Sequence, residues 1–187
     1  NLEDGSFRLE EVREAIRTEN VHHPRTRLVC VENTHSRCGG AVLGPAFIDQ
    51  VGRLAHEAGL SVHLDGARIF HAAVALGVDV KVLTRFADSV QFCLSKGLSA
   101  PVGSLLCGTR EFVREARRWR KVLGGGMRQA GVMAAAGIVA LNTMVDRLAD
   151  DHANARRLAA GLAEVPGFAA DPNKAQTNIV IWDVTTP

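Results

Sequence analysis

Hydrophobic positions in the first hundred or so residues follow two alternating patterns. Short apolar runs that favour strands occur at 28–31, 60–65, 89–94 and 103–108, and the first is typical of a strand buried on both faces. Between them, apolar residues recur at helical spacing over 9–17, 45–59 and 69–76, with Pro45 opening the second helix and Gly59 and Gly77 ending the second and third. Strands that alternate with helices predict crossover connections and a mostly parallel sheet.

The second half of the chain has a different pattern. The third and fourth strands are separated by only a short segment, which predicts a local reversal and therefore a mixed sheet. After Thr109 the pattern is helical, and a stripe from Leu141 to Leu162 predicts a long helix that leaves the sheet. We expect a loop over 169–176 and a terminal strand over 178–184. These segments predict a sheet domain over 1–145, a connecting helix over 146–168 and the start of a smaller C-terminal domain over 169–187.

Composition and charge narrow the classes of protein. The 187 residues carry 22 Lys and Arg against 20 Asp and Glu, a net charge of +2, which argues against a nucleic-acid or membrane-surface partner. No apolar run approaches the ~18–20 residues that span a bilayer. The four cysteines form no C-x-x-C pair, which predicts reduced thiols and a cytoplasmic location.

Lys96 is the first candidate for chemistry. It follows an apolar strand and lies in a loop of small residues, Ser95 to Gly103. In open α/β sheets, ligands bind outside the carboxyl ends of the strands. A lysine that is partly desolvated there can act as an amine nucleophile toward a carbonyl. The alternative interpretation is a solvated loop lysine.

A second candidate group closes the preceding strand. Period-2 alternation places His63 and Asp65 on the same side of the sheet, and Arg68 follows three residues later. A carboxylate beside a heterocyclic nitrogen keeps that nitrogen protonated, which makes a pyridinium ring a stronger electron sink. The structural alternative for Asp65 is a cap on the following helix. Together, Lys96 and Asp65 describe a site for pyridoxal 5'-phosphate.

Five motifs support this interpretation through resemblance to a known family. The chain resembles the low-specificity L-threonine aldolases, which are pyridoxal-phosphate enzymes, over about residues 9–183. The resemblance implies an α/β fold of the aspartate-aminotransferase-like type (fold type I), whose large-domain sheet is mostly parallel but mixed and has helices on both faces. It also implies that this chain is an incomplete fragment of that fold. The motifs are, in chain order, 31–35 (VENTH), 63–68 (HLDGAR), 93–98 (CLSKGL), 118–121 (RWRK) and 124–131 (GGGMRQAG).

The resemblance also implies roles for single residues. Lys96 would form the Schiff base with the cofactor, Asp65 would pair with the pyridine nitrogen, and Arg68 would contact the cofactor beside Asp65. His22, in the segment 22–26 (HHPRT), would lie near the β-hydroxyl of the substrate and act as the catalytic base, although its neighbour His23 leaves the assignment open. Two further basic residues would approach an active site, including that of a neighbouring subunit: Lys121 and Arg128.

The expected reaction is cleavage of a β-hydroxy-α-amino acid, L-threonine or L-allo-threonine, into glycine and acetaldehyde. The expected assembly is a homo-oligomer, a dimer of dimers. Two alternatives remain open: another pyridoxal-phosphate enzyme of the same fold, such as a β-eliminating lyase or a racemase, and a non-catalytic fragment that serves as an interaction scaffold. A nicotinamide-binding fold is disfavoured because no G-x-G-x-x-G follows the first strand.

Other residue patterns carry weaker hypotheses. The basic run 114–121 is typical of a solvated helix face, whereas the triple glycine at 124–126 allows close approach to an anion that Arg128 would bind. Cys38 lacks any base predicted beside it. The histidines and cysteine of the first third have no standard zinc spacing, so we predict no metal site. Side chains of ligand type in this part of the chain include His22, His23, His35, Cys38, His63 and Asp65.

Overall fold

The computed structural model describes residues 2–185 and contains two sheets. The strands of the main sheet are β1 (Leu28–Glu32), β2 (Ser61–Asp65), β3 (Ser89–Cys93) and β4 (Ser104–Gly108). The helices are α1 (Leu9–Ala15), α2 (Pro45–Glu57), α3 (Ile69–Leu76), α4 (Val80–Thr84), α5 (Arg110–Val122), α6 (Gly131–Thr143) and α7 (Leu148–Ala163). A small sheet joins β5 (Phe168–Ala170) to β6 (Trp182–Val184).

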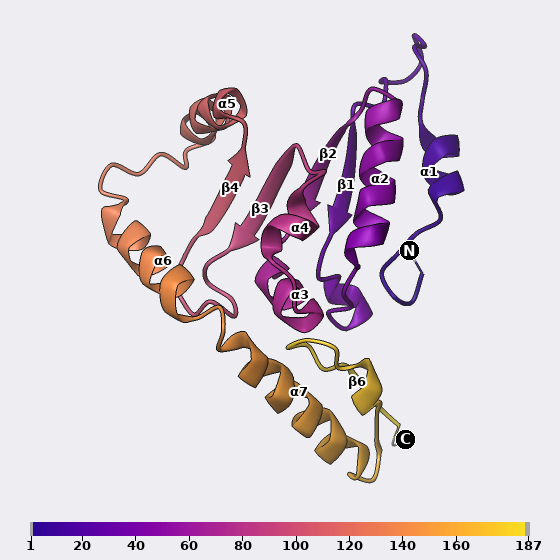
Figure 1. The fold of residues 1–187 in the computed structure, drawn as a ribbon, viewed down its shortest axis with the longest axis vertical. Helices are drawn as coiled ribbons and strands as arrows, with labels where there is room; N and C mark the ends of the chain where they lie inside the picture. The colour runs from indigo at the N-terminus through magenta and orange to yellow at the C-terminus, as the bar shows by residue number, and fades with distance from the viewer. Residues whose placement is uncertain (1, 186–187) are drawn as a thin grey trace.

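The main sheet has the strand order β1-β2-β3-β4, as Figure 1 shows. The first three strands are parallel, and β4 pairs with β3 in the antiparallel direction. This confirms the mixed sheet that the short segment before the fourth strand predicts. Because β1, β2 and β3 run the same way, their carboxyl ends share one edge of the sheet, which we call the carboxyl edge. The opposite edge of the sheet is the amino edge.

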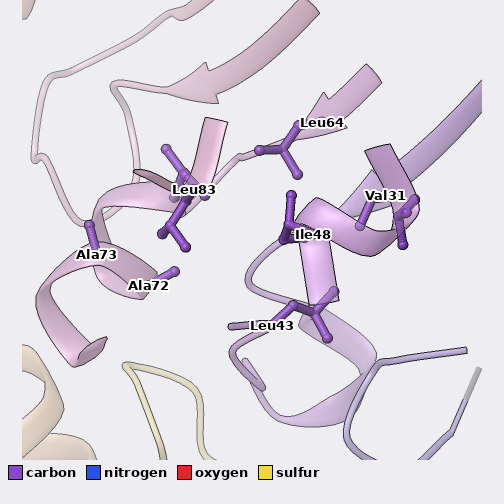
Figure 2. Close-up of a cluster of buried hydrophobic side chains, with 9 residues drawn as sticks. Val31, Leu43, Ile48, Leu64, Ala72, Ala73 and Leu83 are labelled. Carbon is purple, nitrogen blue, oxygen red and sulfur yellow. The ribbon is translucent and has the colours of Figure 1, made fainter. Parts of the chain in front are cut away.

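The hydrophobic core lies between one face of the sheet and the helices α2, α3 and α4 (Figure 2). Alternate strand residues such as Val31 and Leu64 point to this face and are almost fully buried. Ile48 of α2, Ile69 of α3 and Leu83 of α4 close over them. The predicted helix ends are confirmed at α3, where Gly77 stops the helix with a positive φ of 63°. Such a conformation favours glycine because it lacks a Cβ atom.

The other face of the sheet is polar and open within residues 2–185. It carries the alternate residues of the strands, including Cys30, Glu32 and Asp65, which are exposed or half-buried. The apolar run 28–31 predicts a first strand buried on both faces. Instead, Leu28 is 47% exposed, so this strand is buried on one face only in this part of the protein.

The long helix expected from the stripe Leu141–Leu162 is interrupted in the structure. The α6 helix ends at Thr143, α7 begins at Leu148, and the two meet at a bend of 77°. Leu148 is completely buried against Leu94 and Leu98, so packing on the segment after β3 turns the chain at this point. No single helix of residues 2–185 has the length and apolarity to cross a bilayer, and only this bent pair passes that test when its two helices are taken together.

The C-terminal segment also differs from the expectation. The predicted loop 169–176 contains part of β5 and a short 3-10 helix, Pro172–Lys174, and the terminal strand covers only Trp182–Val184. This segment packs on α7 and on the turn after β1. Thr177 is fully buried and its hydroxyl donates to the Gly40 carbonyl at 2.9 Å, which ties the end of the chain to the main sheet.

Candidate functional site

Three strand ends bring polar side chains together at the carboxyl edge. Glu32 and Asp65 are register partners across β1 and β2, and Asp65 is the partner of Gln91 across β2 and β3. Backbone hydrogen bonds continue past the strands, because Asn33 donates to the Asp65 carbonyl at 2.9 Å. Residues in register point to the same face of a parallel sheet. The three side chains therefore line the open face side by side.

The Asp65 carboxylate is held in place by two donors. Its Oδ1 accepts from the backbone N–H of Ala67 at 3.1 Å and from Nε2 of Gln91 at 2.9 Å. Within residues 2–185 no hydrogen bond reaches its second oxygen. The structural alternative, in which Asp65 caps the following helix, is not observed among the described residues. The N-cap residue of α3 is Arg68, and no side chain makes a capping hydrogen bond to this helix. Asp65 is thus oriented by neighbours and keeps one oxygen for a ligand.

Lys96 lies in a defined turn just beyond β3. The Ser99 N–H donates to the Lys96 carbonyl at 2.9 Å, and the Ala100 N–H donates to the Leu94 carbonyl at 3.0 Å. Ser99 adopts a positive φ of 62°, which is uncommon for a residue with a Cβ atom. Leu94 and Leu98 are buried on either side of the exposed lysine, so they anchor the turn in the core. The sequence prediction that Lys96 follows a strand end is confirmed.

Arg68 lies directly after the Asp65 turn and is half-buried. Its Nε atom is buried, and no hydrogen-bond partner reaches it among the described residues. An unsatisfied guanidinium nitrogen costs free energy unless a ligand or water completes it. The predicted role of Arg68, contact with a ligand beside Asp65, would supply that missing partner and stays a prediction.

Glu32 is a residue of this site that the sequence reasoning missed. Burial opposes its ionisation, but hydrogen bonds from the backbone and hydroxyl of Ser36, at 3.0 and 2.8 Å, outweigh it and lower the pKa of Glu32. Electrostatic attraction from His35 and Lys96 acts in the same direction. Lys96 forms no ion pair with Glu32 among the described residues, so its effect on that carboxylate acts over a longer distance. The position of Glu32 at the end of the first strand, within the motif 31–35, is the sequence signal that could have identified this residue.

His22 is not brought to this group. It lies in the segment before β1, where its N–H donates to Oδ1 of Asn20 at 2.9 Å. Figure 1 shows this segment extending beyond the amino end of β1. Glu32 is at the other end of the same strand, which spans roughly 16 Å for five residues. His22 thus lies at the amino edge in this chain, and its neighbour His23 lies in the same turn.

Lys121 and Arg128 also lie away from Lys96. Because β4 reverses direction, α5 begins at the amino edge, and Lys121 is exposed near its end. Arg128 is exposed in the turn between α5 and α6. The side chain of Lys121 lies against Gly126, where an added Cβ atom would be 2.6 Å from its Cδ. The triple glycine therefore brings the backbone close to Lys121, but neither basic residue reaches the carboxyl edge of its own chain.

A separate cavity of about 720 Å³ lies between the turn after β1 and the C-terminal segment. Arg37, Cys38 and Lys174 are among its lining residues, and none of the predicted site residues is. In residues 2–185, no group of three or more His, Cys, Asp or Glu side chains is arranged to hold a metal ion. The chemistry of the carboxyl edge is therefore that of one lysine, one arginine and two carboxylates.

Comparisons with known proteins identify the family to which the sequence is similar. The sequence profile of the beta-eliminating lyase family matches residues 1–185. The chain is 49% identical over 186 residues to "Probable low-specificity L-threonine aldolase 2" of Arabidopsis thaliana, covering 98% of this chain and 52% of that protein. It is 45% identical over 177 residues to the low specificity L-threonine aldolase of Escherichia coli (strain K12), covering 95% and 51%. These matches confirm the resemblance that the five motifs carry.

The fold is also similar to that of solved structures. A threonine aldolase structure from Leishmania major superposes with a TM-score of 0.72 at 19% identity, covering 90% of this chain and 50% of that chain. This likeness supports the fold-type-I architecture alone. The chain spans about half the length of the curated relatives it matches.

Proposed function

Because the chain belongs to the beta-eliminating lyase family, we propose that the whole protein is a pyridoxal-phosphate-dependent aldolase. Its substrates would be L-threonine and L-allo-threonine, and its products glycine and acetaldehyde. The observation that carries this proposal is the placement of Lys96, Asp65 and Arg68 at one carboxyl edge, in a chain 45% to 49% identical to the aldolases named above. Fold alone would not support a reaction.

The residues at this edge fit the cofactor. Arg68 has a buried Nε without a partner in the described residues, and Asp65 has an oxygen that none of them engages. Lys96 would hold pyridoxal phosphate covalently, Asp65 would accept from its ring nitrogen, and Arg68 would contact it beside Asp65. When bound, pyridoxal phosphate supplies an electron sink for the charge that remains on the substrate α-carbon after its bond to the β-carbon breaks.

The carboxylates have different tasks in this proposal. Asp65 is fixed by Ala67 and Gln91, so its carboxylate would accept from the ring nitrogen of the cofactor without first having to be reoriented. Glu32 is fixed by Ser36 and interacts with Lys96. We propose that Glu32 orients the Lys96 ammonium and helps it to exchange protons at the carboxyl edge. Lys96 itself would donate or accept the proton at the substrate α-carbon.

The base that removes the β-hydroxyl proton is proposed from the resemblance to be His22. Because His22 lies at the amino edge of its own chain, this role requires the segment before β1 to reach the carboxyl edge of a neighbouring chain. A homo-oligomer, such as a dimer of dimers, meets that requirement for His22, Lys121 and Arg128. The exposed apolar residues Val132, Ile138 and Val139 of α6 support a further contact surface, since patches of this kind are usually covered.

We retain the predicted organisation of the chain and its location as parts of the proposal. Residues 1–145 would form part of the cofactor-binding large domain, 146–168 the connection, and 169–187 the start of the small domain. Residues 1, 186 and 187 lie outside the described part of the chain. The separate β5–β6 sheet supports the last boundary. A cytoplasmic location is supported by the four cysteines, which are all free thiols.

A second candidate is a β-eliminating lyase, which the description of the family favours. Both reactions use the same cofactor, and they differ in the bond that breaks. The test is to incubate the full-length protein with pyridoxal phosphate and L-threonine and to measure all products. Glycine and acetaldehyde in equal amounts are expected, with L-alanine not cleaved because it lacks a hydroxyl that can lose a proton. Ammonia and a keto acid would refute the aldolase and support the lyase.

A further inference from the structure

Two buried histidines meet beneath the Lys96 turn. His71 of α3 and His152 of α7 are 2% and 4% exposed, and Nδ1 of His71 lies 2.9 Å from Nε2 of His152. Their ring centroids are 5.1 Å apart with an interplanar angle of 36°. The two residues are 81 positions apart in the sequence, so the pair joins the sheet domain to the helix that leads to the C-terminal segment. Neither side chain is exposed to a substrate.

The far edge of the His71 ring supports Gly97, the residue that follows Lys96. A Cβ atom added to Gly97 would lie 2.1 Å from Nε2 of His71 and 2.9 Å from Cδ2 of Leu148. Real Cβ atoms are not found at such distances, so the position requires glycine and the ring forms the floor of the turn. That same Nε2 is buried without a hydrogen-bond partner among residues 2–185. The ring is thus fixed by its bond to His152 and by contact with Gly97.

Burial, together with nearby positive charge, favours the neutral form of the pair. A hydrogen bond between two ring nitrogens needs one protonated and one free nitrogen, which two imidazolium rings cannot provide. Burial, followed by the nearby His152 and Arg68, lowers the pKa of His71 to about 4. Burial and Arg156 also lower the pKa of His152, against the opposing attraction of Asp151. Near neutral pH the hydrogen bond is therefore available.

We propose that His71 and His152 are a positioning pair, which fixes the backbone of the Lys96 turn through Gly97 and couples that turn to α7. Leu148, at the start of α7, contacts the same glycine and is completely buried. A displacement of α7 would therefore move the floor of the lysine turn. The importance of this placement for catalysis rests on the proposed function, whereas the coupling itself can be measured without it.

The first test is a double-mutant cycle in the full-length protein without cofactor. Gly97→Ala forces a methyl group onto the His71 ring, and His71→Ala removes that ring. We expect each single variant to lower the Tm, and the double variant to lose less than the sum of the two losses, because the new methyl group occupies space that the ring vacates. Gly161→Ala is the matched control, since an added Cβ on this exposed glycine of α7 meets nothing within 4 Å. Additive losses would overturn the contact.

The second test measures the placement of Lys96 directly and does not depend on the glycine variants. The acylation rate of Lys96 by acetic anhydride is followed by peptide mass spectrometry from pH 6 to 9, with exposed Lys81 of the same molecule as reference. His152→Leu should change the acylation rate of Lys96, relative to that of Lys81, by about twofold or more across this pH range. His152→Gln, whose amide can still bond to His71, should restore it. Unchanged Lys96 labelling in His152→Leu would overturn the proposal.

The holoenzyme then separates the two proposals. If the protein is an aldolase, His152→Leu should lower kcat by ~10-fold or more while KM changes little, because misplacement of a reacting group costs rate rather than binding. If the wild-type protein is inactive, but the Tm losses are non-additive and His152→Leu alters Lys96 labelling, the aldolase proposal is refuted and the His71–His152 pair is supported. If the wild-type protein is active, but the Tm losses are additive and Lys96 labelling is unchanged, only the proposal for the His71–His152 pair is refuted.

Discussion

Glu32 and Asp65 are partners in the register of two parallel strands, and each ends its strand on the open face of the sheet. Two carboxylates side by side require positive charge or hydrogen-bond donors nearby. Each has its own: Ser36 donates twice to Glu32, and Ala67 and Gln91 donate to Asp65. The charge of Lys96, which follows β3, also acts on Glu32 at the end of β1. The hydrogen bonds from Ser36 lower the pKa of Glu32 against the effect of its burial, and the donors on Asp65 fix the orientation of its carboxylate on the same face.

Lys96→Ala should remove the attachment of pyridoxal phosphate to the chain. In the full-length protein, borohydride treatment should leave no cofactor bound, and the cleavage rate should fall by ~10²–10⁴-fold. The measurements are intact mass after reduction and a coupled aldehyde assay. Lys81→Ala, on the exposed face of α4, is the control and should behave like the wild type. A reduced adduct that persists in Lys96→Ala would show that another amine is used.

Asp65→Asn should preserve the fold but impair the reaction. The amide oxygen of asparagine can accept the same bonds from Ala67 and Gln91, so the Tm should change by only a few degrees. Loss of the fixed charge should lower kcat by ~10²–10³-fold. Asp79→Asn is the control, because Asp79 caps α4 and asparagine caps helices equally well. Normal turnover by the Asp65 variant would limit this residue to shaping its turn.

Glu32→Gln should alter the reactivity of Lys96. Glu32→Gln removes the negative charge on which Lys96 acts, so the rate of Lys96 acylation without cofactor, measured relative to that of Lys81, should differ from the wild-type rate. Ser36→Ala, which removes one of the two donors that orient Glu32, should have a smaller effect in either direction. An unchanged rate in Glu32→Gln would show that the carboxylate does not influence the lysine.

Arg128→Ala should weaken retention of the cofactor or the apparent affinity for substrate more than Arg114→Ala does. Arg128 follows the triple glycine, which permits close approach to an anion, whereas Arg114 belongs to the exposed face of α5. Loss of pyridoxal phosphate on dialysis and KM for L-threonine are the two measurements. Equal values for the two variants would argue against a ligand role for Arg128.

The His71–His152 pair predicts how stability depends on pH. A histidine whose folded pKa is depressed stabilises the fold fully above the unfolded value of 6.5, and this contribution is lost as pH falls toward the folded value of about 4. For His71 the loss over that window is about 3 kcal/mol. The lowered pKa of Glu32 also stabilises the fold above its ordinary pKa of 4.5, and this contribution is lost as the pH falls below 4.5.

Urea unfolding of the full-length protein from pH 8 to pH 4.5 checks this prediction. The free energy of unfolding of the wild type should decline below pH 6.5, and His71→Asn should show a shallower decline. The variant His56→Asn is a suitable comparison, because His56 is an exposed histidine that pairs with Asp88. Equal slopes in the wild type and His71→Asn would contradict a depressed pKa at this position.

Local sequence patterns were sufficient for much of the main sheet. The apolar runs located β1 to β4 to within a residue or two, and the positions of Pro45 and Gly77 marked the first residue of α2 and the end of α3. The reason is that burial of one strand face and the left-handed conformation of a stop residue depend on a few neighbouring residues. The same local logic placed Lys96 and Asp65 at strand ends.

The sequence alone could not locate features that depend on distant packing. The break between Thr143 and Leu148 occurs because Leu148 is buried against Leu94 and Leu98, which precede it by about fifty residues in the chain. The short strands β5 and β6 exist only as partners of each other, and their three-residue length carries no periodic signal. The apolar run 178–184 did predict a terminal strand that includes β6, whereas β5 begins at the edge of a predicted loop and had no local signal.

By itself, the sequence therefore determined the fold class, the cofactor hypothesis and the two strand-end residues that define it, since these follow from periodicity and from motif order. Only the tertiary structure decided which side chains share the carboxyl edge: it added Glu32, placed His22, Lys121 and Arg128 elsewhere, and brought His71 against Gly97. Register and helix direction set these proximities, and both result from long-range packing that no local pattern encodes.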